Sequence, residues 1–258
     1  MLLLSIENEV PELPSFITVL YKYFSETIWA QTLHNWEAVI FAFIVASVVS
    51  FLLMFAIRKK EMIPSGAQNF VEWIYELIEN LIISVLGERE RRFIPFLTSI
   101  FVYIFSMNIF GMIPLMRSPS SNINITVALA TCVFCLVQYL NIKNFGLFGF
   151  LHHMAGSPKV WWQWFFAPFM FFLELIAQLS RPLTLSLRLF GNILGEDILI
   201  GAFALFGVIL FSGVSTTIGL PLQVPSMIFS LLASLMQALV FTLLSSVYIL
   251  LSMNHSTE

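Results

Sequence analysis

Long runs of apolar residues separated by short polar stretches are the main pattern of this chain. Residues 36–57 contain the first run, which is closed by three basic residues, and residues 93–142 contain two more around a turn rich in Pro, Ser and Asn. A helix needs about 20 predominantly apolar residues to cross the hydrocarbon core of a bilayer. The pattern therefore predicts an all-α, polytopic membrane protein with a first span at 36–57 and a transmembrane hairpin at 93–142.

Residues 65–86 show a different periodicity. One helical face carries Phe70, Ile74, Leu77, Leu81 and Val85, and the other carries Glu72, Glu76, Glu79 and Asn80. This spacing predicts an amphipathic helix lying along the inner membrane surface. Its polar face is acidic, which favours a protein neighbour over lipid headgroups; a solvated face without a partner is the alternative.

The last long segment, residues 161–253, can cross the membrane in two ways. Counted by apolar runs, 161–179, 182–212 and 224–253 make three further crossings. Alternatively, 161–212 crosses once as a broken and strongly tilted helix, paired with 224–253 in a hairpin. The polar break at Gln178–Pro182 must then be buried in protein. Periodicity alone leaves both counts open.

Basic residues mark one side of the predicted spans. They lie at 58–60, 89–92 and 143, and the positive-inside rule assigns these ends to the cytoplasm. Residues 1–35 then form a short outer segment, and residues 144–160 an inside loop. Because no signal or transit peptide is visible, we expect a single integral membrane domain over 1–258 in a bacterial inner membrane.

Charged residues are rare in the last segment and lie close together. Between 160 and 254 there are five, all within 24 residues: Glu174, Arg181, Arg188, Glu196 and Asp197. A central arginine costs about 2.5–3.5 kcal/mol on insertion scales, so it is kept where it faces protein or water. Snorkelling would explain one such charge. Five charges together with Asn192 and Gln178 favour a site that handles ions or protons.

Helical spacing places most of these polar groups on one face. Those within roughly 40° of Arg188 are Glu174, Arg181, Thr184 and Asn192. Glu196 lies about 80° away, and Asp197 lies nearly opposite. Pro182 is expected to interrupt the helix, which loosens the alignment of the residues before it.

Composition excludes several classes of protein. The 258 residues are 59% hydrophobic and 10% charged, which a soluble fold does not need. A net charge of −3 without a basic patch argues against nucleic acid. We interpret Cys132 and Cys135 as packing residues and His152–His153 as a solvated pair, so no metal or cofactor is expected. A nucleophile–base pair, which a membrane enzyme would need, is not visible.

The segment SLRLFGN at 186–192, followed by Gly195-Glu196-Asp197, closely resembles the signature of subunit a of F-type ATP synthases. The resemblance extends to Met107-Asn108, to SNINIT at 121–126 and to LMQA at 235–238. It covers most of residues 36–253. It implies five crossings, a cytoplasmic C-terminus, and a tilted hairpin at 161–253 that faces a rotor ring.

The resemblance also implies a mechanism and partners. A ring of subunit c hairpins would carry membrane-buried carboxylates past Arg188, which meets each in its ionised form and blocks a direct leak between two aqueous half-channels. Arginine suits this role because it stays charged and presents a planar fork. Further partners are the peripheral-stalk subunit b, the bilayer and the transported ion, expected to be a proton rather than sodium. The chain itself would hold no ATP-hydrolysing site.

The proton path implied by the motif positions includes Glu174, Asn192, Gln237 and the Glu196–Asp197 pair, with Arg181 and Thr184 as supporting residues. Two positions depart from the family pattern. The acid nine residues after the arginine is Asp197 and follows another acid, and Ser230 occupies a position where some members have histidine. On helix geometry we expect Glu196 to carry the proton and Asp197 to tune it.

Two other classes of function remain as alternatives. A secondary transporter could use a buried arginine at a broken helix as its substrate site. It would predict an internal repeat and a second broken helix in the first half, and neither is found. A purely structural scaffold would not need the five clustered charges. Copurification with a ring of small subunits distinguishes these possibilities.

Overall fold

The computed structural model describes residues 15–23, 28–58, 66–113, 115–156, 161–211 and 222–254. All regular structure in these ranges is helical, which confirms the all-α class. The α-helices are α1 (Phe16–Tyr23), α2 (Ile28–Asn35), α3 (Glu37–Ala56), α4 (Ala67–Leu86), α5 (Ile94–Gly111), α6 (Ile123–Met154), α7 (Trp161–Phe211) and α8 (Gln223–Asn254). Two short 3-10 helices, η1 (Glu88–Phe93) and η2 (Pro119–Ser121), precede and follow α5.

Five of the described helices are long and apolar enough to cross a membrane. They are α3, α5 with the residues before it, α6, α7 and α8. This number agrees with five crossings, and the chain is an integral membrane protein. It also decides between the two ways of counting the last segment, because residues 161–211 form a single helix.

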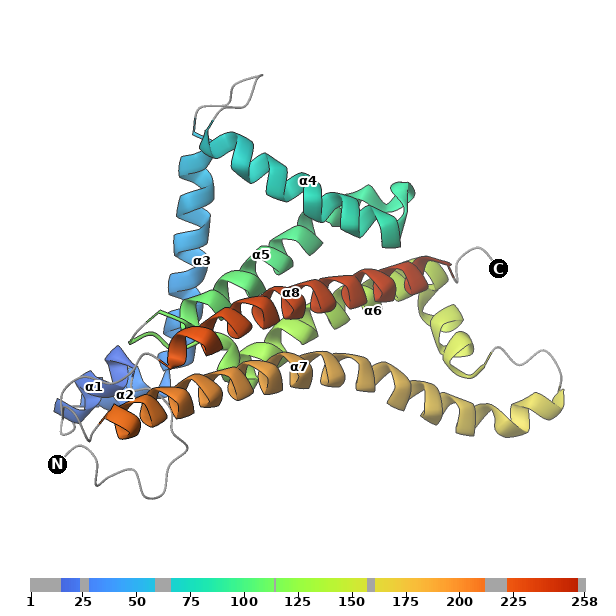
Figure 1. Ribbon diagram of the computed structural model, residues 1–258. Helices are drawn as coiled ribbons and strands as arrows, with labels where there is room; N and C mark the ends of the chain where they lie inside the picture. Colours follow the sequence, from blue (N-terminus) through green and yellow to red (C-terminus); the bar gives the residue numbers. More distant parts are fainter. Residues whose placement is uncertain are drawn as a thin grey trace.

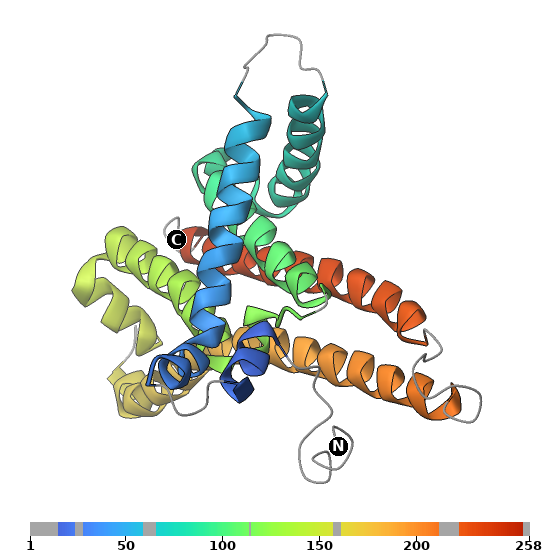
Figure 2. The ribbon, with the colours of Figure 1, turned by 90° about the vertical axis from the view of Figure 1, so that its left-hand side faces the viewer.

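Helices α7 and α8 run across the direction of α3 in both views of the molecule (Figures 1 and 2). They contact each other, and α8 also packs against α4, α5 and α6. The fully buried side chains at this junction include Leu97 and Ile104 of α5, Leu189 of α7 and Phe241 of α8. Lipid tails are as apolar as leucine, so close packing rather than the hydrophobic effect holds such helices together.

Helix α4 uses two apolar stripes. Ile78, Ile82 and Leu86 are buried against the rest of the protein, whereas Phe70 and Leu77 of the predicted apolar face are exposed. The stripe that packs on the protein is therefore displaced by one residue along the sequence from the stripe that was predicted. The exposed stripe remains available to the bilayer, as expected for a helix on a membrane surface.

Helix α6 is longer than its predicted span. Residues 144–160 were expected to form a loop, but the helix continues to Met154 with a kink at Gly146. Gly146 has φ 69°, a left-handed conformation that glycine adopts without steric cost. The loop prediction was wrong for residues 147–154, which form a second helical piece after the sharp kink at Gly146. Residues 157–160 of the predicted loop lie outside the described residues.

The expected break at Gln178–Pro182 is also corrected, because α7 is assigned as one helix through Pro182. Figure 1 shows that it curves along its length. Hydroxyl groups on both sides of the proline donate to backbone carbonyls: Thr184 Oγ1 to those of Ser180 and Arg181, and Ser180 Oγ to that of Ala177. Such bonds from Ser and Thr hydroxyls to carbonyls of the same helix can bend a helix without ending it.

Candidate functional site

The side chain of Arg188 is exposed on α7, in the middle of an apolar helix. Its neighbours Leu185 and Leu189 are buried and pack the adjacent side of α7 against the protein. Thr184 and Asn192, one turn to either side, are exposed with it. Among the residues that the structure describes, no carboxylate or hydrogen-bond acceptor pairs with Arg188. The arginine therefore presents an uncompensated charge on the outer face of the hairpin.

The surface of α7 around Arg188 has little side-chain bulk, because two glycines lie beside the arginine. A Cβ atom added at Gly191 or Gly195 would meet nothing within 4 Å. In an ideal helix both lie within about 60° of Arg188. Small residues on a membrane helix allow another backbone to approach closely. This face can therefore accept a neighbouring helix near the guanidinium group.

Glu196 is held from two helices. The Asn192 Nδ2 donates to one carboxylate oxygen at 2.8 Å, and the Ser234 Oγ of α8 donates to the other at 3.5 Å. The first bond confirms that Asn192 and Glu196 share one side of α7. Asp197 is half-buried next to this pair.

Ser234 was missed by the sequence analysis. Most hydroxyls of α8 donate to carbonyls of their own helix, as those of Thr242, Ser245 and Ser246 do. Ser234 instead reaches across to α7, although its residue is fully buried. No signal in the sequence separates it from the other serines of α8, because the difference lies in how the two helices are aligned.

Ser230 and Gln237 lie on the same side of α8 as Ser234, one turn before and one turn after it. Both residues are buried, and the Ser230 Oγ and Gln237 Nε2 find no hydrogen-bond partner among the described residues. An unpaired buried donor costs about 1–3 kcal/mol. These atoms therefore favour the presence of water along this face of α8.

The contact between Ser234 and Glu196 also indicates which residue of α7 lies beside Gln237. In an antiparallel pair with this register, Gln237 is level with Ile193, which is five residues or about 7.5 Å along the helix from Arg188. Gln237 is buried whereas Arg188 is exposed. The two side chains belong to the same hairpin, and no hydrogen bond joins them among the described residues.

Glu174 and Arg181 belong to a second polar group, nearer the start of α7. Gln178 Nε2 donates to Glu174 Oε1 at 3.3 Å, and the Arg181 guanidinium lies over the Tyr248 ring at 5.5 Å. No ion pair links Glu174 to Arg181 among the described side chains. Gln178 also accepts a hydrogen bond from Gln138 of α6, a residue that the sequence analysis did not single out.

Comparison with known proteins shows the family. The family model described as "ATP synthase A chain" matches residues 39–250. The chain belongs to the ATP synthase A chain family. It is 62% identical over 253 residues to "ATP synthase subunit a" of Protochlamydia amoebophila, covering 98% of this chain and 93% of that protein. Identity is 36% over 235 residues to the protein of the same name from Trichlorobacter lovleyi, covering 90% and 95%.

The match to the ATP synthase A chain family includes both polar groups of the site. Residues 174–197 and 230–248 lie inside the matched range, which begins within α3 and ends within α8. The resemblance carried by the segment around Arg188 is confirmed by this match over most of the chain.

Proposed function

We propose that this chain is the stationary membrane subunit of a rotary ATP synthase, and that it guides protons to and from the carboxylates of a rotating ring of subunit c hairpins. Membership of the ATP synthase A chain family supports the general assignment. The transported ion is the proton, and the chain itself does not hydrolyse ATP.

The exposed position of Arg188 carries this proposal. A charge facing lipid at this depth costs about 2.5–3.5 kcal/mol on insertion scales, so another protein is expected to cover it. The covering surface must supply a negative charge, because no carboxylate of the described chain reaches the guanidinium. A passing ring of buried carboxylates meets this requirement one carboxylate at a time. The guanidinium cannot pass on a proton, so it also separates the two half-channels.

We assign one half-channel to each of the two polar groups of the hairpin. Glu196 with Asn192, Ser234, Ser230 and Gln237 forms the outer one, with Asp197 beside it. Glu174 belongs to the inner one. Arg188 and Thr184 lie between the groups along α7, and Arg181 lies two turns after Glu174. A proton entering on one side must therefore ride the ring past Arg188 to leave on the other.

Contacts near the end of α8 support a cytoplasmic C-terminus. The Arg92 Nη2 lies 3.7 Å from the Met253 Sδ, and Asn144 Nδ2 donates to the Ser252 carbonyl at 3.3 Å. The end of α8 is thus close to Arg92 and to the residue after Lys143. The positive-inside rule assigns these basic positions to the cytoplasm. With five crossings the N-terminal segment then lies outside, in a bacterial inner membrane.

The peripheral-stalk subunit b is proposed as the partner of the acidic side of α4. Glu72 and Glu76 are exposed on this helix beside its apolar stripe. Their like charge disfavours anionic lipid headgroups and suits a basic protein surface.

The assignment is tested by purification and reconstitution. The chain is expected to copurify with a ring of small subunits, and the complex in vesicles to acidify the lumen on ATP addition, with or without sodium. A lone chain that transports a small solute would replace the proposal with the secondary transporter.

We expect Ser234→Ala to reduce ATP-driven proton pumping about fivefold, because Glu196 loses the bond that holds it toward α8. Ser245→Ala is the matched control, since Ser245 is equally buried but donates to its own helix. Pumping rates in vesicles containing each variant provide the measurement. Equal rates for the two variants would show that the Ser234 bond does not matter.

A further inference from the structure

We propose that water fills the pocket between α6, α7 and α8 and forms part of the inner half-channel, where Gln138 and Gln178 hold it beside Glu174. This inference rests on the proposed function and adds α6 to the proton path. Gln138 was not among the residues expected at the site, and Gln178 was expected there only as a member of the polar cluster.

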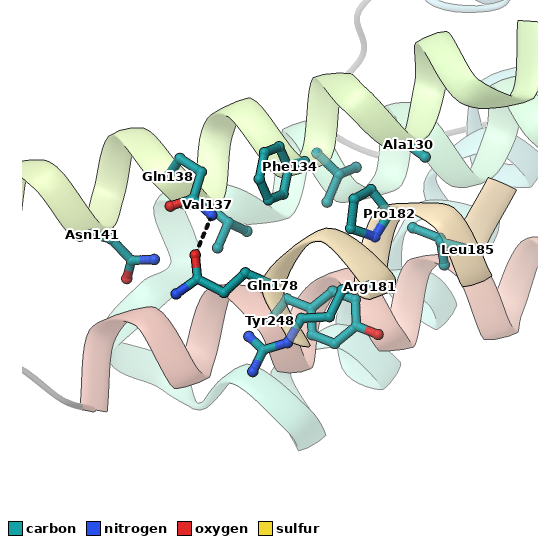
Figure 3. A pocket seen from close by; sticks show the side chains of 11 residues that line it. Ala130, Phe134, Val137, Gln138, Asn141, Gln178, Arg181, Pro182, Leu185 and Tyr248 are labelled. Carbon is teal, nitrogen blue, oxygen red and sulfur yellow. Dashed lines mark hydrogen bonds between the residues drawn. The ribbon is translucent and has the colours of Figure 1, made fainter. Parts of the chain in front are cut away.

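The pocket has the size and the lining that one water molecule needs. Its volume is about 20 Å³, and a bound water needs about 10–15 Å³ with two to four polar partners. Gln138, Asn141, Gln178 and Arg181 supply polar groups among apolar lining residues. Figure 3 shows the amides of Gln138, Asn141 and Gln178 toward the end of α6 that leads to Lys143, the proposed cytoplasmic end.

A chain of hydrogen bonds connects the pocket to Glu174. Gln138 Nε2 donates to Gln178 Oε1 at 2.8 Å, and Gln178 Nε2 donates to Glu174 Oε1 at 3.3 Å. This direction of donation leaves Gln138 Oε1 as the free acceptor at the far end. That atom is buried and has no partner among the described residues. A water molecule in the pocket can donate a hydrogen bond to this oxygen. In a dry pocket the oxygen would stay without a donor, which costs free energy.

Arg181 makes water a better occupant than a metal cation. Its guanidinium borders the pocket and lies over the Tyr248 ring. The fixed positive charge repels sodium, and the small volume excludes larger anions. The proton itself moves along the water, whereas the two amides only position water and the Glu174 carboxylate.

Silver ions test whether water reaches the pocket, because they are small and bind thiolates that contact water. Cys132 and Cys135 are first replaced by serine, since both are free and exposed on α6. Gln138→Cys in the assembled complex is then treated with silver ion, denatured and labelled with a maleimide. Leu136→Cys is the control, because Leu136 is partly buried against the apolar core and does not line the pocket. We expect silver to protect position 138 and not position 136; equal protection would overturn the proposal.

Passive proton flux through the complex, with its water-soluble part removed, tests the role of the water. Gln138→Leu and Gln178→Leu are each expected to lower the flux about fivefold, and the double variant by little more. Gln138→Ser removes the bond to Gln178 but leaves room for water, so it should retain most of the flux. A purely structural Gln138–Gln178 pair predicts equal loss for Ser and Leu, which would overturn the proposal.

Tyr139→Leu, at an exposed neighbour outside the pocket, should leave the flux unchanged. Silver protection is measured without any activity. A failure of the proposed function therefore shows separately, as absence of ATP-driven pumping by the unsubstituted complex.

Discussion

Replacement of Arg188 by alanine is expected to reduce ATP-driven proton pumping to background while the complex still assembles. The side chain is exposed and makes no bond to the described part of its own chain, so its removal leaves no cavity and no unpaired partner. What disappears is the charge that a ring carboxylate would meet. Pumping in vesicles, together with the amounts of this chain and of the ring in the purified complex, provides the measurement.

Passive proton flux distinguishes this result from misfolding. Without the guanidinium the two half-channels are no longer separated, so flux through the membrane part should persist while coupled pumping is lost. Arg188→Lys should also fail, because an ammonium lacks the planar fork and can give up its proton. Leu183→Ala is the control, since Leu183 is exposed on α7 about 140° away from Arg188. Normal pumping by Arg188→Ala would refute the proposed role.

Helix boundaries were predictable where hydrophobic pattern and charge agree. The first span was expected at 36–57 and the surface helix at 65–86; the structure has α3 at Glu37–Ala56 and α4 at Ala67–Leu86. Apolar length decides whether a helix can span a bilayer, and this is a local property of the sequence. Prediction failed at residues that can either end a helix or only bend it. Pro182 lies inside α7, which curves, and Gly146 lies at the kink between the two helical pieces of α6.

The polar residues of the site were predictable only as far as one helix determines them. The shared side of Asn192 and Glu196 follows from a spacing of four residues. The partners from other helices do not follow from spacing. Ser234 reaches Glu196, and Gln138 reaches Gln178, only because of the register between separate helices. A glutamine within an apolar span was a usable signal, because a polar group at that depth needs a partner.

The cysteines illustrate the same limit. Cys132 and Cys135 were interpreted as packing residues, but both are exposed on α6 and free. Their spacing places them on neighbouring sides of the helix but does not say which side meets protein. In a membrane the outward side is as apolar as the inward one, so the pattern does not distinguish lipid from protein neighbours.

The roles of Glu196 and Asp197 can be separated by neutralising each in turn. Glu196→Gln is expected to lower ATP-driven pumping about 10²-fold, because a proton-transferring group typically contributes 10²–10⁴-fold.

The same measurement on Asp197→Asn should show a several-fold smaller loss. Glu196 accepts hydrogen bonds from Asn192 and from Ser234, which places its carboxylate at the contact between α7 and α8. The buried Ser230 and Gln237 donors continue this contact along α8, and water bound there would connect Glu196 to the outer side. An ideal helix turns Asp197 away from Arg188 and therefore away from the ring.

Glutamine and asparagine keep the size of each side chain, so a difference between the variants reports the lost proton and not the packing. A larger loss for Asp197→Asn would assign the proton to Asp197 and leave Glu196 as its neighbour.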